Sequence, residues 1–254
     1  MLDHEAYAFM TQTYRLVLAT SEEHVDAVKA LRKEVLLEKY RNFGSIEDEE
    51  RFAWDESDAQ AFIYLLQHPK SGRYVGTIRV FFINDATPLK EMPMEHYSHA
   101  SRIAELKAAL PVCEISRFAL SANLPKESKH SAQWVRIHLS LLLMIGTRIT
   151  AQIYPFKMIF AIMEPSLARL LRWQKAHFEQ IGSEVDYYGT TIPFAIERNT
   201  LLSDTFATQK VSCYYLGQFS QPGGSLDRFL AQCPYIDAEM LNLDACVPDR
   251  SPHT

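Results

Sequence analysis

Runs of apolar residues along the first third of the chain predict a strand, a helix and a hairpin. Residues 14–19 form a short apolar run typical of a strand. Apolar positions then recur at helical spacing from about residue 22 to residue 41, after a Thr-Ser-Glu-Glu segment typical of a helix start. Residues 42–55 are polar and acidic and predict a loop. Two further apolar runs, 61–66 and 74–83, flank a Pro-Lys-Ser-Gly turn and predict a β-hairpin.

Further along the chain, the pattern predicts strands and helices in alternation. The run 111–121 predicts a strand, and residues 131–152 predict a long helix. The wholly apolar run 157–163 is typical of a strand buried in the centre of a sheet. Pro165 is a favourable first residue for a helix that ends near residue 176. Residues 178–197 predict a pair of strands.

The last 55 residues do not continue this alternation. They contain a Gln-Pro-Gly-Gly-Ser segment, which is typical of a linker, and a short helical pattern at 226–232. We therefore predict one main domain at 1–199 and a C-terminal extension at 200–254, to which the sequence assigns no role.

Composition narrows the class of protein. The chain has 254 residues, 47% hydrophobic and 22% charged, as in ordinary globular proteins. A net charge of −5 gives no reason to expect nucleic-acid binding. Four scattered cysteines show neither zinc spacing nor a disulfide framework, and no signal peptide is visible. We expect a cytoplasmic protein without bound metal, which could touch a membrane surface if its product is lipidic.

The strand predicted at 111–121 carries a carboxylate and a guanidinium three residues apart, Glu114 and Arg117. Because side chains alternate along a strand, these two should point to opposite faces of a regular sheet. They can serve one site only if a β-bulge lies between them, and bulges often re-aim side chains beside active sites. The alternative is an edge strand with two solvated charges.

The segment Glu-Ile-Ser-Arg-Phe, with Trp-Asp-Glu-Ser-Asp at 54–58 and Val-Gly-Thr-Ile-Arg at 75–79, resembles the acyl-homoserine-lactone (autoinducer) synthases. It resembles still more the N-acyl amino acid synthases, including exosortase-associated acyltransferases. The similarity extends from about residue 14 to residue 197. It implies an α/β fold like that of the GCN5-related N-acetyltransferases, whose mixed central sheet splays at the active site between flanking helices. It also implies an N-acyltransferase activity.

The resemblance also implies a site. Acyl transfer from a thioester to an amine needs a base and hydrogen-bond donors for the developing oxyanion. Glu114 is the candidate base, and the main-chain N–H groups of Phe118 and Ala119 are the candidate donors. A charged cluster would orient an α-amino acid acceptor through its carboxylate and ammonium groups: Arg32, Asp55, Asp58, Glu114 and Arg117. Alternatively, Arg32 is a surface arginine over the core, and the two aspartates belong to a solvated loop.

The acyl donor is inferred from a missing motif. Acetyl-CoA enzymes of this superfamily usually hold the pyrophosphate in a glycine-rich loop after this strand, whereas residues 121–127 contain no glycine. This favours the acyl-phosphopantetheine of an acyl carrier protein over CoA. Carrier proteins are acidic and need a basic partner surface. Arg169, Arg172 and Lys175 on the helix that begins at Pro165 could supply it, or could simply be a solvated face.

Three departures bear on the acceptor. Lactone synthases usually have aromatic residues where this chain has Leu36 and Asn42, and often an acid where it has Ala53. This favours a plain amino acid over S-adenosylmethionine. The predicted function is an N-acyl amino acid synthase with long-chain acyl carrier protein as donor. The alternatives are a lactone synthase, and a catalytically inactive fold that binds acyl carrier protein or lipid as a regulator.

Overall fold

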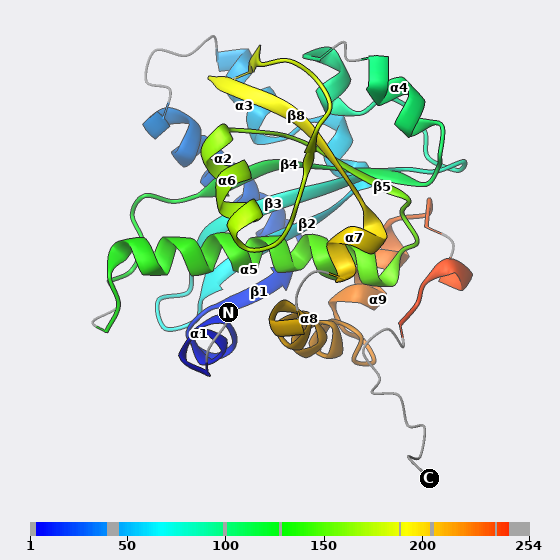
Figure 1. Ribbon diagram of the computed structural model, residues 1–254. Helices are drawn as coiled ribbons and strands as arrows, with labels where there is room; N and C mark the ends of the chain where they lie inside the picture. The colour runs from blue at the N-terminus through cyan, green and yellow to red at the C-terminus, as the bar shows by residue number, and fades with distance from the viewer. Residues whose placement is uncertain are drawn as a thin grey trace.

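The computed structural model describes residues 4–39, 46–98, 101–126, 129–187, 189–203, 206–236 and 238–243, without the side chains of 36–39, 46–48, 101, 206–207 and 238. Its centre is an eight-stranded mixed sheet with helices on both faces (Figure 1). The strands are β1 (Arg15–Leu18), β2 (Ala61–His68), β3 (Arg73–Ile83), β4 (Val112–Leu120), β5 (Met158–Met163), β6 (Glu179–Gln180), β7 (Val185–Asp186) and β8 (Thr190–Glu197).

The helices lie between and after these strands. The α-helices are α1 (His4–Ala8), α2 (Glu22–Lys39), α3 (Ile46–Ala53), α4 (Ser101–Lys107), α5 (Ala132–Ile153), α6 (Pro165–Trp173), α7 (Arg198–Ser203), α8 (Phe206–Phe219) and α9 (Ser225–Gln232). Short π- or 3₁₀-helical segments are η1 (Phe9–Thr13), η2 (Glu56–Gln60), η3 (Pro93–His96) and η4 (Ala238–Met240).

Most elements agree with the hydrophobic pattern, but two predictions need correction. The loop expected at 42–55 is wrong where Ile46–Ala53 forms α3; residues 42–45 lie outside the described part. The acidic run at 47–50 concealed the short apolar face that half-buried Phe52 and buried Ala53 form. The pair of strands expected at 178–197 is one long strand, β8, with two-residue partners β6 and β7.

The sheet opens in its middle. The order is β1-β2-β3-β4-β5-β8-β6, with β7 also paired to β8. Strands β4 and β5 run parallel and pair from Val112–Met158 to Ile115–Ala161. β4 then continues to Leu120 without a partner on that side among the described strands. The splay predicted between these two strands is therefore present.

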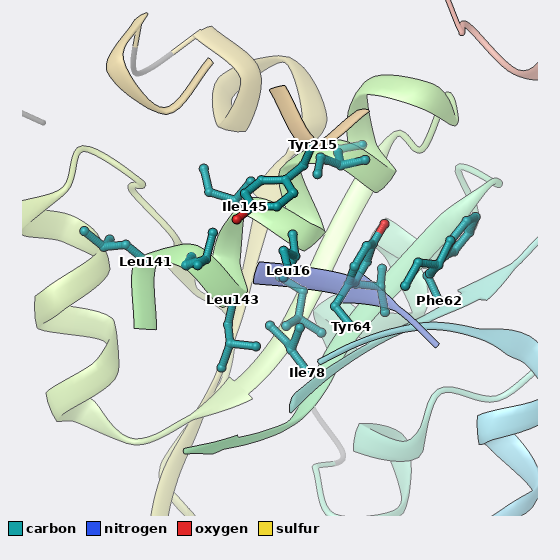
Figure 2. Close-up of a cluster of buried hydrophobic side chains, with 14 of the residues drawn as sticks. Leu16, Phe62, Tyr64, Ile78, Leu141, Leu143, Ile145 and Tyr215 are labelled. Carbon is teal, nitrogen blue, oxygen red and sulfur yellow. The ribbon is translucent and has the colours of Figure 1, made fainter. Parts of the chain in front are cut away.

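Alternation along β2 and β3 divides the core into two layers. Phe62 and Tyr64 of β2 face α5, whereas Ile63 and Leu65 of the same strand face α2. The α5 layer contains Leu16, Ile78, Leu141, Leu143 and Ile145, and Tyr215 of α8 joins it (Figure 2). The α2 layer is smaller and includes residues of η3 and α4. The charged residues singled out in the sequence lie mainly on the α2 side.

The C-terminal extension packs onto the α5 layer. Helices α8 and α9 lie against it, to the right of β1 in Figure 1. The Phe229 ring stacks on Phe62 with 4.2 Å between centroids. The Tyr215 hydroxyl donates a 2.6 Å hydrogen bond to the carbonyl of Met10. The described part of the extension thus shares one hydrophobic core with the sheet.

Two findings bear on the expected compartment. Cys113 and Cys233 are buried free thiols. Cys213, in contrast, is disulfide-bonded, which the scattered cysteine positions did not predict. Among the described residues, every helix is too short or too polar to cross a membrane.

Candidate active site

A buried ion pair ties α2 to the segment after α3. Arg32 is fully buried, and its two terminal nitrogens donate to the two oxygens of Asp58 at 2.9 Å each. Arg32 Nη1 also donates to the carbonyl of Ala53 at 3.0 Å. Arg32 is therefore not a surface arginine.

Of the three departures noted above, only buried Ala53 can be placed, because Asn42 and the side chain of Leu36 lie outside the described residues.

Asp55 and Asp58 cap the first turn of η2 reciprocally. Asp58 Oδ2 accepts from the Asp55 N–H at 2.9 Å, and Asp55 Oδ1 accepts from the Ser57 N–H at 2.9 Å. The caps hold both carboxylates in place. Each carboxylate also accepts hydrogen bonds from guanidiniums on other elements. The Asp-x-x-Asp spacing is therefore a folded turn and not a solvated loop.

A third guanidinium, which the sequence analysis did not select, completes the network. Arg79 on β3 is fully buried and lies 2.6 Å from Asp55 Oδ1 and 3.5 Å from Asp58 Oδ1. Its Nε donates to Ser116 Oγ at 3.0 Å. The available signal was an arginine inside the apolar run 75–83, because a charge there needs buried partners.

The predicted bulge is present on β4. Thr77 pairs with Ala119 and Arg79 with Ser116, so the single residue between them on β3 opposes Arg117 and Phe118. Arg117 has φ 53°, in the left-handed region that non-glycine residues rarely adopt. The extra residue turns the Arg117 side chain toward the face that Glu114 occupies.

Arg117 is held on one side only. Its Nη2 donates to Asp55 Oδ2 at 2.7 Å, and its guanidinium lies 4.6 Å from the centroid of the Phe52 ring. The side chain is 8% exposed. Among the described residues, Nε and Nη1 are buried without a hydrogen-bond partner. Burial lowers the pKa of Arg117, but Tyr187 and Asp55 outweigh it and raise the pKa above its usual value.

The surroundings give the carboxyl groups of Asp55 and Glu114 different pKa values. Burial favours a higher pKa for Asp55, but Arg79 and Arg117 lower it to about 2. Glu114 is 2% exposed, and burial raises its pKa to about 7 against the opposing effect of Arg79. Near neutral pH, Asp55 is thus a fixed anion, while Glu114 can gain or lose a proton.

Glu114 is covered by η3 and connected to Ser116. Its Oε2 accepts from the Met94 N–H at 2.8 Å, and the Ser116 hydroxyl also hydrogen-bonds to it. Glu114 lines neither of the two clefts beside the network, whereas Ser116 lines one of them.

The two clefts meet at Arg117. The α3 cleft, about 830 Å³, is lined by Trp54 and Asp55 beyond α3 and by Tyr97 beyond η3. The splay cleft, about 550 Å³, lies where β4 and β5 separate. Of the described residues, Arg117 and Tyr187 are the two that line both.

The splay cleft exposes main chain as well as apolar side chains. Phe118 and Ala119 line it from β4, opposite Met163 of β5 and Leu167 of α6. Because the pairing with β5 ends at Ile115, the main-chain groups of β4 beyond that point face the cleft on this side. Such groups can donate to an oxyanion.

Helix α6 forms one wall of the splay cleft. Leu167 and Leu170 line the cleft, whereas Arg169 and Arg172 are exposed. Lys175 lies just beyond the helix, also exposed, with φ 70°. The three basic side chains are thus solvent-facing beside the cleft wall. Among the described residues, no group of three or more His, Cys, Asp or Glu side chains could hold a metal ion.

No protein-family model and no curated protein matches this sequence. Solved structures match in fold. FeeM, an N-acyl amino acid synthase from uncultured soil microbes, is 14% identical, covers 78% of this chain and 96% of its own, and gives a TM-score of 0.53. The AHL synthase LasI is 14% identical, with coverages of 73% and 90% and a TM-score of 0.43. A GNAT-family acetyltransferase from Streptococcus agalactiae is 12% identical, with coverages of 73% and 96% and a TM-score of 0.45. The likeness to FeeM confirms the predicted fold.

The raised pKa of Glu114 predicts a specific pH dependence of stability. In the unfolded chain this carboxyl loses its proton near pH 4.5, but in the folded protein only near pH 7. Stability from this group is therefore complete below pH 4.5 and is lost as pH rises toward 7. Glu114→Gln keeps an acceptor for Met94 and does not titrate. Its free energy of unfolding, relative to wild type, should rise by roughly 2–3 kcal/mol between pH 5 and pH 8.

Urea unfolding at four pH values measures this difference. Glu184→Gln, at an exposed glutamate, is the matched control and should show no comparable rise. A difference for Glu114→Gln that stays constant with pH would show that Glu114 titrates as it does in the unfolded chain.

Proposed function

We propose that this protein is an N-acyltransferase that moves a long-chain fatty acyl group from acyl carrier protein to the α-amine of an amino acid. The observation that carries the proposal is Arg117, a buried guanidinium between two clefts, whose Nε and Nη1 have no hydrogen-bond partner among the described residues. The shared fold with an N-acyl amino acid synthase supports the same reading.

The acceptor's carboxylate would bind to Arg117 in the α3 cleft. The carboxylate would accept a charge-assisted hydrogen bond from Nε or Nη1, the two nitrogens without a partner among the described residues. Arg32, Arg79 and Arg117 face Asp55, Asp58 and Glu114, so the network has one excess positive charge while Glu114 is protonated. Asp55 lines the same cleft and carries a negative charge that attracts the acceptor's ammonium group.

Glu114 would take the proton that the ammonium must lose, with Ser116 as the connection. Ser116 lines the splay cleft, hydrogen-bonds to Glu114 and accepts from Arg79. A pKa of about 7 suits a group that gains and releases a proton near neutral pH. The neutral amine then attacks the thioester carbonyl, the C–N bond forms, and the C–S bond breaks. The nitrogen's remaining excess proton leaves with the thiolate as a thiol.

The splay cleft would hold the thioester itself. Phe118 and Ala119 line the cleft, and their main-chain N–H groups would stabilise the oxyanion of the tetrahedral intermediate. Apolar residues of β5 and α6 surround the remaining space and suit a fatty acyl chain or the pantetheine arm. Arg117, at the junction, places the acceptor's amine beside the carbonyl.

Carrier protein is the proposed donor because basic residues flank the cleft and the glycine loop is missing. Arg169, Arg172 and Lys175 are exposed next to the helix wall formed by Leu167 and Leu170. An acidic carrier protein would be attracted to this surface, and its phosphopantetheine would enter the adjacent cleft. Such a donor would place the reaction in the cytoplasm.

Lipid extracts of a host that expresses the protein should contain N-acyl amino acids, detected by mass spectrometry. The purified protein with acyl carrier protein and an amino acid should give the same product. Homoserine lactones without acyl amino acids would instead indicate a lactone synthase that uses S-adenosylmethionine. Tight binding of acyl carrier protein without any product would indicate a non-catalytic binding module.

The variant Arg117→Lys should lose recognition of the carboxylate. A lysine ammonium cannot reproduce the fixed, planar array of donors of a guanidinium. The preference in kcat/KM for a free amino acid over its carboxamide should fall by roughly tenfold or more. Arg51→Lys, on the rim of the same cleft, is the matched control and should keep the preference. An unchanged preference in Arg117→Lys would show that Arg117 does not recognise the carboxylate.

Reversing Arg169 and Arg172 to glutamate should weaken the carrier-protein donor specifically. The loss should fall mainly on the association rate and should shrink as salt concentration rises. Acyl-CoA of the same chain length should be much less affected, because it presents no acidic protein surface. Arg15→Glu, exposed on β1 at the far edge of the sheet, is the control. Equal losses with both donors would contradict carrier docking at α6.

A further inference from the structure

Tyr187 occupies a special place at the junction of the two clefts. Arg117 and Tyr187 are the two described residues that line both the α3 cleft and the splay cleft. Arg117 is fixed by Asp55 and by the Phe52 ring. Tyr187 comes from the turn between β7 and β8, and its ring packs on Tyr97 with 4.0 Å between centroids. One wall of the junction is thus charged and the other aromatic.

The aromatic wall is built from two short segments that approach from different parts of the chain. The Tyr187 N–H donates to the Gly189 carbonyl at 3.0 Å, and Gly189 takes φ 104°, so the turn is tight. Tyr97 follows η3, and its N–H donates to the Met94 carbonyl at 3.1 Å. Tyr97 is 40% exposed, whereas Tyr187 is half-buried.

We propose that Tyr187, supported by Tyr97, is a partition that keeps water in the α3 cleft away from the thioester in the splay cleft. This inference rests on the proposed acyl transfer. It makes Tyr187 a positioning residue that decides which nucleophile reaches the carbonyl. The guanidinium of Arg117 admits the acceptor by its carboxylate, and the aromatic rings close the rest of the opening.

Acyl transfer needs such a device because water competes for the same carbon. Attack by the amine forms a C–N bond, breaks the C–S bond and moves a proton from nitrogen to the thiolate. Attack by water forms a C–O bond, breaks the same C–S bond and yields a free fatty acid and the thiol. The same oxyanion donors serve both reactions, so they cannot discriminate. Limiting the access of water to the carbonyl carbon can.

A role for the Tyr187 ring and a role for its hydroxyl predict different results for substitutions of this residue. The Tyr187 hydroxyl is close enough to raise the pKa of Arg117, so a chemical role of the hydroxyl is the competing explanation. A partition needs only the volume of the ring. Tyr187→Phe keeps that volume and removes the hydroxyl, whereas Tyr187→Ala removes both.

The test measures two products of one reaction. Purified acyl carrier protein with a long acyl chain is incubated with enzyme and amino acid, and N-acyl amino acid and free fatty acid are both quantified. Tyr187→Ala should raise the ratio of hydrolysis to transfer by roughly tenfold. Tyr187→Phe should keep a ratio of hydrolysis to transfer close to that of wild type. Tyr97→Ala, which removes the support from the other segment, should raise the ratio less than Tyr187→Ala.

Tyr214→Ala is the control for loss of an exposed tyrosine, since Tyr214 is 39% exposed on α8, on the α5 side of the sheet. If wild type transfers acyl groups and neither Tyr187→Ala nor Tyr97→Ala changes the ratio, the partition is overturned while the proposed function stands. A Tyr187→Phe variant that behaves like Tyr187→Ala would also overturn it, in favour of a role for the hydroxyl. If wild type transfers to no amino acid, the proposed function fails, and the partition fails with it.

Discussion

The carboxylate of Asp55 is the contact on which the rest of the site depends. One oxygen accepts from Arg79 on β3 and the other from Arg117 on β4, while the Asp55 N–H donates to Asp58, which holds Arg32 on α2. Four elements are thereby joined through buried charges. Removing one member of such a network leaves an uncompensated charge inside the protein, which typically costs about 3–5 kcal/mol. The network is therefore a constraint on the fold as well as a site.

The bulge in β4 connects this network to the opening of the sheet. A regular strand would place Arg117 on the face away from Glu114. The extra residue puts Arg117 on the same side, at a left-handed φ that is unfavourable for a residue with a Cβ. The contacts with Asp55 and Phe52 hold it there. The same stretch of β4 has lost its pairing with β5, so the charged cluster and the splay cleft are adjacent.

The two layers of the core have different tasks. The α5 layer is large and apolar, and the described part of the C-terminal extension adds Tyr215 and Phe229 to it. The α2 layer is smaller. It carries the charged network, the η3 segment that covers Glu114, and the α3 cleft, which Tyr97 lines. The charged network and the left-handed Arg117 thus lie on the α2 side of the sheet, and the α5 side supplies most of the hydrophobic stabilisation.

The sequence by itself determined the repeating features of this protein. Periods of two and of 3.6 residues identify strands and helices because they depend only on neighbouring positions. The spacing of Glu114 and Arg117 also indicated that a bulge must lie between them if both serve one site, since alternation leaves no other way to bring them together. Five charged residues predicted to cluster do lie around one site: Arg32, Asp55, Asp58, Glu114 and Arg117.

The tertiary structure decided what depends on segments far apart in the chain. Arg79 is a member of the network only because β3 passes over Asp55, 24 residues earlier in the chain. Glu114 has a raised pKa because η3 covers it and shields it from water. Tyr187 stands between the clefts only because its turn meets Tyr97. Burial, pKa and the boundary between two clefts are properties of the surroundings, and no local pattern encodes those.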